Sequence, residues 1–396
     1  MTLRTWWRGT RDPLSQAQLS QTISFARITL IIGLVFLHYH TFPNSRISPF
    51  RGLDTQQHQV ATFINSFILF FFFSVVPLLS MVSGWLFFSF RASDAWSAIR
   101  QRISRRFMSL YVPLVAWNAF FLAILYFLFM HDPDNALLDR ANIDFNTAPL
   151  REYINAMFAV TQHPVAFQFW FVRDLFLTVL VSPILWLLLR RAPYPGLIAL
   201  CWAWITGMHL FIFFRTDVLF FFYLGGLIRS RAVPLDISKR ATVTFVALYI
   251  GLVALRALAP YAFAHEPPIL EVLTRAMRPF GVLAGWGLFV WIAPTRLGNF
   301  VARYGGLAFF LHAAHYPLLA EVKILLWTLV PAQTDAWMLA HYVASVTVTV
   351  AIGISAGLML ARWVPSLFEL MNGGRGLTKP KPAPGGAQLP LPTPAG

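Results

Sequence analysis

The chain contains the stretch SFARITLIIGLVFLHYHT at residues 24–41, and this stretch sets the class of fold. It is largely apolar, with Arg27 near its start and His38 and His40 near its end. About 20 apolar residues in a helix cross the roughly 30 Å hydrocarbon core of a bilayer. The stretch therefore predicts a membrane-spanning helix. Because residues 1–23 are polar and no small-residue cleavage site follows the stretch, we expect a signal anchor that stays in the chain.

The composition of the whole chain supports the same class. Of 396 residues, 57% are apolar and only 12% are charged, whereas charged residues make up about a quarter of a soluble globular chain. The apolar runs are also much longer than the roughly 10-residue strands of a membrane β-barrel. We therefore expect an all-α integral membrane protein. The single cysteine, Cys201, excludes an intramolecular disulfide and a cysteine-based metal site.

Ten stretches near 20 residues in length, each bounded by charge, Pro or Gly, predict about ten transmembrane helices. The expected spans are residues 24–41, 63–89, 107–130, 168–189, 195–213, 216–228, 241–259, 272–293, 305–330 and 336–361. The sixth is short, and the second and ninth are long enough to tilt or to be interrupted. All ten lie in one predicted transmembrane domain, residues 24–362. The following tail, 363–396, is rich in Pro and Gly from about residue 372, which predicts disorder there.

Basic residues predict the orientation of these spans, because Lys and Arg gather in cytoplasmic loops. If the N-terminus is cytoplasmic, most of the 31 Lys and Arg residues fall in inside segments, and the long acidic segment 131–166 falls outside. We therefore expect both termini in the cytoplasm. The net charge of +15 is compatible with nucleic-acid binding, but the basic residues form short clusters between apolar runs. The expected partner is the lipid bilayer and not a nucleic acid.

The first span carries a polar stripe. An ionisable side chain inside a membrane helix costs on the order of 3 kcal/mol, so each one needs a partner or a function. His38 follows Arg27 by eleven residues, which puts both side chains on nearly the same helix face about 16 Å apart, whereas His40 points to the opposite side. This stripe suits a substrate that enters phosphate-first from the inside. Alternatively, the histidines anchor the helix at the membrane interface and Arg27 extends to the headgroups.

Two further groups of basic residues stand at helical spacing. Arg102, Arg105 and Arg106 are at positions i, i+3 and i+4 as the third span begins, and three guanidinium groups on one face suit phosphates. Their alternative role is to supply the positive charge that orients the span. In the ninth span, His312 and His315 share a face, but no third ligand stands at a suitable spacing. We therefore expect hydrogen bonding within the bundle and no metal.

Two other motifs lie in predicted spans. The fourth span opens with QFWFVRDLF at residues 168–176, in which Arg173 and Asp174 are adjacent. Adjacent residues diverge on a helix, so the motif does not by itself require an internal ion pair. In the sixth span, FFYLGG at residues 221–226 supplies small residues where two helix backbones approach closely.

Together and in this order, the motifs resemble those of the acyltransferase 3 family of multispanning membrane O-acyltransferases, over about residues 20–362. The matching segments are Arg27 and His38 eleven residues apart, SGWLFF at 83–88, Arg102, Arg105 and Arg106 before Pro113, FWFV at 169–172, FFYLGGLIRSR at 221–231 and FLHAAHYP at 310–317. Two positions depart from the family pattern. His312 stands where the family often has Tyr. Asp174 follows Trp170 by four residues, where many polysaccharide-modifying members have Glu five residues after it.

The resemblance implies a function and assigns roles to residues. It implies transfer of an acyl group, which we expect to be acetyl, from cytoplasmic acyl-CoA to a sugar hydroxyl of an exported polysaccharide or its lipid-linked precursor, in the bacterial inner membrane. It implies that His38 is the catalytic histidine, that Arg27 is its partner in the same helix and that His315 is the histidine of the ninth span. It assigns the acyl-donor site to Arg102, Arg105 and Arg106. The chemistry is consistent, because His has a pKa suited to a base near neutral pH and Arg suits the CoA phosphates.

Two other functions are compatible with a membrane bundle. A transporter or flippase for a glycan or lipid would also place Arg and His within the membrane, but inverted repeats and helix pairs broken by Gly or Pro are not apparent. A structural subunit of a polysaccharide-export complex would not explain the stripe of Arg and His. For the enzyme, we expect one passage lined by Arg27, His38 and His315, open inward to the donor and outward to the acceptor.

Overall fold

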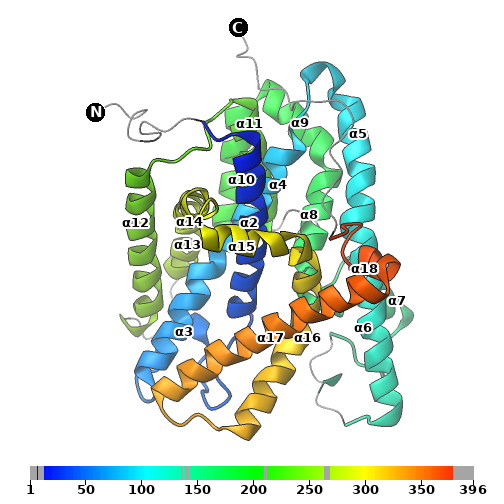
Figure 1. Ribbon diagram of the computed structural model, residues 1–396, viewed down its shortest axis with the longest axis vertical. Helices are drawn as coiled ribbons and strands as arrows, with labels where there is room; N and C mark the ends of the chain where they lie inside the picture. The colour runs from blue at the N-terminus through cyan, green and yellow to red at the C-terminus, as the bar shows by residue number, and fades with distance from the viewer. Residues whose placement is uncertain are drawn as a thin grey trace.

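The computed structural model describes residues 13–134, 142–208, 212–262 and 268–377, together with Trp7, Leu137, Leu138 and Leu210. In these residues the chain forms helices and turns and no strand, so the predicted all-α class is confirmed. Helix α2 (Gln16–Leu37) runs through the middle of the bundle (Figure 1). We call the end of the molecule where α2 begins the Gln16 end, and the opposite end the His38 end.

The other helices pack around α2. Helices α5 and α6 lie at one edge of the bundle and α12 at the other (Figure 1). The helix bounds are α3 Gln59–Phe71, α4 Val75–Phe87, α5 Ala95–Arg106, α6 Val112–His131, α7 Leu150–Phe158, α8 Trp170–Leu180, α9 Ser182–Arg191, α10 Pro193–Thr206, α11 Thr216–Ser230, α12 Lys239–Leu258, α13 Pro268–Ala276, α14 Arg278–Ile292, α15 Arg296–Ala302, α16 Ala308–Leu329, α17 Asp335–Trp363 and α18 Pro365–Met371.

Six segments in the described part of the chain are helical, long and apolar enough to cross a membrane. They are Gln16–Leu37, Gln59–Phe87, Ala92–His131, Lys239–Leu258, Arg296–Leu329 and Asp335–Trp363. The pair Phe167–Leu180 and Ser182–Arg191 is bent by 58° and gives a seventh if it counts as one span. In the three other predicted spans, α10, α11 and α14 are 14 or 15 residues long, which is short for a bilayer. The chain is a multi-pass membrane protein, and the number ten and the cytoplasmic termini stay predictions.

The sides of the bundle carry the apolar surface that lipid requires. Phe127 and Ile184, for example, are 60% and 61% exposed. Large apolar side chains exposed in such numbers are unfavourable in water, whereas hydrocarbon accommodates them. The exposed apolar surface therefore agrees with the composition.

Both spans that were expected to tilt or to be interrupted change their helical geometry partway along. A short turn, Phe72–Ser74, separates α3 from α4. In α16, Tyr316 has an extended backbone (φ −126°, ψ 131°) before Pro317, which has no N–H to continue the helix. The amide Nε2 of the buried Gln168 donates to the carbonyls of Ala313 at 2.8 Å and Tyr316 at 2.9 Å. Gln168 thus satisfies carbonyl groups that the break in the helix leaves free.

Helices α4 and α11 pack backbone against backbone. A Cβ atom on Gly84 would lie 1.9 Å from the carbonyl oxygen of Phe222, and one on Gly225 would lie 2.0 Å from that of Met81. Only glycine fits at such distances. The close approach predicted for FFYLGG is therefore confirmed, and its partner is the SGWLFF segment of α4.

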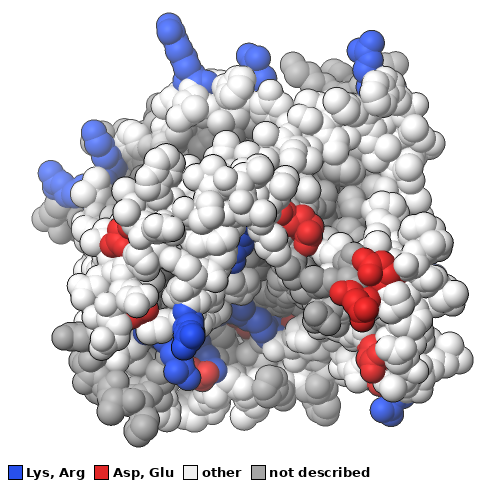
Figure 2. Space-filling model, turned by 90° about the horizontal axis from the view of Figure 1, so that it is seen from below, with Lys and Arg blue, Asp and Glu red and all other residues white. Residues whose placement is uncertain are grey.

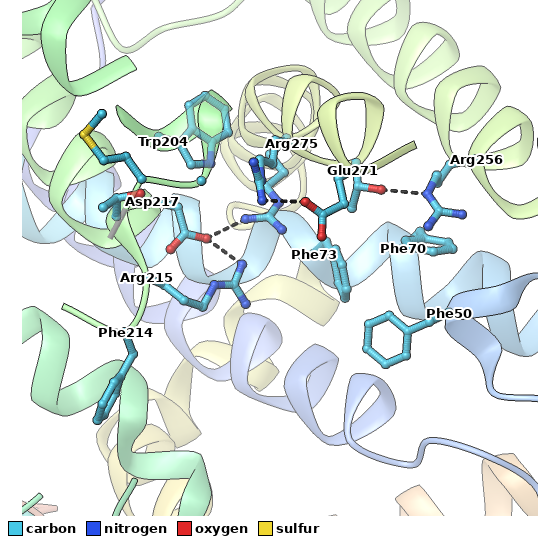
Figure 3. Close-up of a pocket in the computed structure, with 15 residues that line it drawn as sticks. Phe50, Phe70, Phe73, Trp204, Phe214, Arg215, Asp217, Arg256, Glu271 and Arg275 are labelled. Carbon is cyan, nitrogen blue, oxygen red and sulfur yellow. Dashed lines mark hydrogen bonds and ion pairs between the residues drawn. The ribbon is translucent and has the colours of Figure 1, made fainter. Parts of the chain in front are cut away.

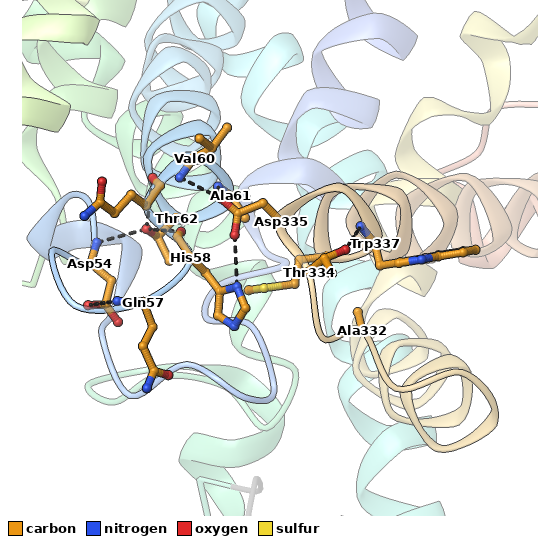
Figure 4. Close-up of polar contacts among 12 residues, drawn as sticks. Asp54, Gln57, His58, Val60, Ala61, Thr62, Ala332, Thr334, Asp335 and Trp337 are labelled. Atoms are coloured by element: carbon orange, nitrogen blue, oxygen red, sulfur yellow. Dashed lines mark hydrogen bonds and ion pairs between the residues drawn. The ribbon is translucent and has the colours of Figure 1, made fainter.

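At the His38 end, Asp335 joins the start of α17 to the start of α3 (Figure 4). Its Oδ2 accepts the backbone N–H groups of Val60 at 3.0 Å and Ala61 at 3.4 Å, and its Oδ1 lies 2.9 Å from Nδ1 of His58. The first N–H groups of a helix have no partner within that helix, and they favour a negative charge. This contact fixes two helices beside the turn that follows His38.

Candidate functional site

The structure brings together the two histidines predicted for the catalytic site. His38 directly follows α2, and His315 lies on α16 just before its break. Nδ1 of His38 and Nε2 of His315 are 2.8 Å apart, and the two rings are nearly parallel with centroids 5.0 Å apart. Both side chains are buried. Residues separated by most of the chain therefore form one hydrogen-bonded pair.

The hydrogen bonds around His315 define which nitrogens carry protons. Nδ1 of His315 lies 2.6 Å from the carbonyl oxygen of His312, which can only accept, so this nitrogen carries the proton. In the neutral ring, Nε2 of His315 then accepts, and Nδ1 of His38 must donate to it. Nε2 of His38 is left with a free lone pair. The chain of bonds therefore orients His38 as a base.

Side chains from two other helices hold the turn after His38. Lys323 donates to the carbonyl of Tyr39 at 3.1 Å and to that of Thr41, and Asn65 donates to the carbonyl of His40 at 2.9 Å. These bonds satisfy carbonyl groups beyond the end of α2. His40 has φ 58°, a left-handed conformation that is uncommon outside glycine. The backbone that carries His38 is therefore fixed in place.

A cavity of about 180 Å³ adjoins His38. His40, His312, Arg215 and several aromatic side chains line it with His38. Of the three residues expected to line one continuous passage, only His38 belongs to this lining, because His315 and Arg27 are not among its residues. The cavity reaches His38 of the histidine pair, and the continuous passage stays a prediction.

His312 differs from the other two histidines. Its side chain is buried, and neither of its ring nitrogens has a hydrogen-bond partner among the described residues. The centroids of the His312 and His315 rings are 5.7 Å apart. Within the described residues, no three His, Cys, Asp or Glu side chains are grouped to hold a metal ion. The hydrogen bonding expected in the ninth span is formed by His315.

Arg173 and Asp174 form a buried ion pair, although neighbours on a helix usually diverge. NH1 of Arg173 lies 2.8 Å from Oδ1 of Asp174, and its Nε donates to the carbonyl of Ala159 at 2.8 Å. Oδ2 of Asp174 accepts the backbone N–H of Arg215 at 2.8 Å. The Arg215 guanidinium lies over the ring of Trp170, 4.8 Å from its centroid. The pair thus anchors the segment that brings Arg215 to the cavity.

The three arginines predicted for the donor site have different surroundings in the structure, although Arg102 lies close enough to both Arg105 and Arg106 for their charges to interact. Arg102 donates to the carbonyls of Leu86 at 3.0 Å and of Phe87, near the end of α4. Arg105 is exposed. Arg106 lies close enough to Arg27 for their charges to interact. Arg102 therefore contacts the end of α4, and Arg106 extends the basic group toward Arg27.

Residues 372–377, where the sequence predicts disorder to begin, lie against α16. Nδ2 of the buried Asn372 donates to the carbonyl of Arg375 at 2.6 Å, and its Oδ1 accepts the N–H of Phe310 at 3.1 Å. These bonds fix the position of Arg375. The remainder of the predicted tail, 378–396, lies outside the described residues.

Arg375 joins Arg27 and Arg106 in a group that we call the arginine cluster. A Cβ on Gly373 would lie 2.4 Å from the carbonyl oxygen of Ser109, so the turn after α18 lies against the segment that follows Arg106. Burial and the charges of Arg27 and Arg106 lower the pKa of Arg375. In the part of the chain that the structure describes, no carboxylate pairs with any of the three. The cluster is therefore suited to binding an anion.

Two buried ionic residues near the cavity were not predicted. Oδ2 of Asp217 lies 2.7 Å from NH2 of Arg215 and 2.6 Å from NH1 of Arg278. Asp217 and Arg278 lie in apolar runs taken as the sixth and eighth spans. An ionisable residue within an apolar run was the signal that would have found both.

The fold and the site define a multi-pass helical membrane protein with a buried histidine pair beside a cavity. The acyltransferase domain family matches residues 21–358, which is most of the chain. The chain belongs to this family, as its motifs indicated, and is a membrane O-acyltransferase.

Among curated proteins, the chain is similar to the succinoglycan biosynthesis protein ExoH of Rhizobium meliloti (strain 1021). The two are 27% identical over 368 residues, which cover 91% of this chain and 93% of that protein. No solved structure matches the chain. The family and this relative therefore provide the functional comparison.

Proposed function

We propose that the protein transfers an acyl group, with acetyl as the expected group, from acyl-CoA on the cytoplasmic side to a sugar hydroxyl of an exported polysaccharide or its lipid-linked precursor. Its membrane would be the bacterial inner membrane. Membership of the acyltransferase family supports the transfer, and similarity to a succinoglycan biosynthesis protein supports a polysaccharide acceptor. The observation that carries the mechanism is the hydrogen-bond chain from the carbonyl of His312 through His315 to His38.

In this mechanism His38 acts as the general base. Its Nε2 takes the proton of the sugar hydroxyl as that oxygen attacks the thioester carbonyl carbon. The new carbon–oxygen bond forms, the carbon–sulfur bond breaks, and His38 returns the proton to the sulfur of CoA. His315 is a positioning residue, because it accepts from Nδ1 of His38 and keeps Nε2 directed toward the substrate.

The arginine cluster is the donor site in this proposal. Three guanidinium groups without a carboxylate partner in the described chain suit the phosphates of CoA. Eleven residues of α2 separate Arg27 from His38, or about 16 Å along the helix. An extended pantetheine arm spans such a distance, so CoA stays on one side while its acyl group reaches His38. Arg102 and Arg105 extend this donor site, because the charge of Arg102 interacts with those of Arg105 and Arg106.

A direct test uses the purified wild-type protein in lipid nanodiscs with acetyl-CoA and the oligosaccharide repeat of the polysaccharide made in the same cells. We expect release of the free thiol of CoA together with an acetylated sugar, detected by mass spectrometry. A transporter or flippase would instead move labelled glycan across a liposome membrane without thiol release. That result would overturn the proposed function.

A further inference from the structure

A second and larger pocket lies beside the cavity at His38. Its volume is about 330 Å³, within the range of roughly 300–1,000 Å³ that is typical of ligand sites. Phe50, Phe73 and Arg215 line both spaces, so the pocket and the cavity adjoin. Viewed from the His38 end, the molecule is hollowed, and charged side chains are visible within the hollow (Figure 2). We call this space the outer pocket.

The outer pocket has an excess of positive charge. Its described lining contains four arginines and two carboxylates, namely Arg215, Arg256, Arg275, Arg278, Asp217 and Glu271. The two carboxylates are already engaged, Asp217 with Arg215 and Arg278, and Glu271 with Arg275 at 2.8 Å (Figure 3). These pairs fix the directions of the guanidinium groups without cancelling their total charge. An anion is the ligand that balances the excess.

Three buried atoms of pocket residues lack hydrogen-bond partners among the described residues. Nε of Arg278 and Nε1 of Trp204 are donors without an acceptor, and Oδ1 of Asp217 is an acceptor without a donor. A ligand that satisfies these atoms must carry acceptor oxygens and at least one hydroxyl group. The remaining wall includes the buried Phe70 and Trp204 together with Phe50, which is 39% exposed and whose face suits the apolar side of a ring (Figure 3). Anion, hydroxyl and ring together describe an acidic sugar.

We propose that the outer pocket is the acceptor site and that the acceptor is an acidic sugar. The arginines bind its carboxylate or phosphate group, and Asp217 accepts a hydrogen bond from one of its hydroxyl groups. Arg215 stands where the two spaces meet, so a sugar held there extends a neighbouring hydroxyl toward His38. The inference rests on the proposed function, because it takes that hydroxyl as the group acylated.

The test measures binding to the full-length protein in nanodiscs by thermophoresis. The probes are trigalacturonate, the same trisaccharide with its carboxyl groups reduced to alcohols, and glucose 1-phosphate. We expect trigalacturonate to bind at least about tenfold more tightly than its reduced form. Arg215→Gln should remove this preference and Arg215→Lys should keep part of it. Binding of glucose 1-phosphate in place of trigalacturonate would assign the anion to a phosphate.

Arg46→Gln is the matched control, because Arg46 is an exposed arginine outside the pocket lining. It should leave the preference unchanged. Equal binding of the acidic and reduced sugars, failure of both anionic probes to bind, or an unchanged preference in Arg215→Gln would overturn the inference. Thiol release from acetyl-CoA is measured on the same samples. If the wild-type protein released no thiol, the proposed function would be contradicted. The binding measurements would still test separately whether the outer pocket binds an acidic sugar.

Discussion

Two arginine-rich regions of the molecule differ in what accompanies their charge. The arginine cluster of Arg27, Arg106 and Arg375 has no carboxylate partner in the described chain. In the outer pocket, by contrast, Asp217 pairs with Arg215 and Arg278. Unpaired guanidinium groups attract any polyanion strongly, whereas paired ones have fixed directions and a smaller net charge. The first arrangement suits a donor with several phosphates, and the second suits discrimination among sugars.

The largest effect is expected at His38, which belongs to neither arginine region. We expect His38→Ala to lower acyl transfer by about 10²- to 10⁴-fold, because the substitution removes the proton acceptor and spares both arginine regions. Transfer is measured as thiol release from acetyl-CoA, and donor binding as a control should persist. His40→Ala is the matched variant and should keep most activity. An active His38→Ala protein together with an inactive His40→Ala protein would move the base to the other histidine.

The second largest effect is expected in the arginine cluster. Arg106→Gln should raise the KM for acetyl-CoA about 10- to 100-fold, because a hydrogen bond to a charged group contributes about 1.5–3 kcal/mol. The kcat should change little. Arg106→Lys keeps the charge but not the bidentate geometry of the guanidinium group, so its KM for acetyl-CoA should lie between those of the wild type and Arg106→Gln. Steady-state kinetics with varied donor measure this.

Arg105→Gln controls for the net charge of α5, since Arg105 is exposed one residue away. It should change the donor KM much less than Arg106→Gln does. If Arg105→Gln and Arg106→Gln change the donor KM equally, the charge of α5 serves membrane topology and the donor site lies elsewhere.

A smaller effect is expected at Arg375. Arg375→Gln should raise the donor KM roughly three- to fivefold, as expected for a partly exposed charged contact. Acetyl-dephospho-CoA, which lacks one phosphate, tests the cause. If Arg375 binds that phosphate, the substitution should have little effect on the KM of this donor. Arg362→Gln, an exposed arginine near the end of α17, serves as control.

The features that the sequence predicted depend on residues within a single helix. Apolar runs of span length indicate the all-α membrane class, because the pattern is local. The spacing placed Arg27 and His38 on one face of a predicted helix, and His315 stood out as an ionisable residue in an apolar run. The expectation that His38 and His315 belong to one site came from the order of the family motifs and not from spacing.

The features that sequence did not predict depend on neighbours distant in the chain. Arg102 and Arg106 acquire different neighbours, because one donates to the end of α4 and the other lies near Arg27. Composition predicts disorder near residue 372, yet the single side chain of Asn372 holds that segment against α16. Likewise, Asp217 becomes part of a site only once Arg278 is folded beside it.

The smallest expected effect is the response of the two regions to salt. Salt screens exposed unpaired charges more than charges already held in ion pairs. The donor KM should therefore rise roughly two- to threefold from low to high ionic strength, while the acceptor KM changes less. Kinetics with varied donor and varied acceptor at matched osmolarity, using potassium chloride against sucrose, separate charge screening from general effects. In Arg106→Gln the salt dependence of the donor KM should shrink, because part of the screened charge is gone. If the donor KM and the acceptor KM depended equally on salt, the carboxylates of the outer pocket would not account for a difference between the two regions.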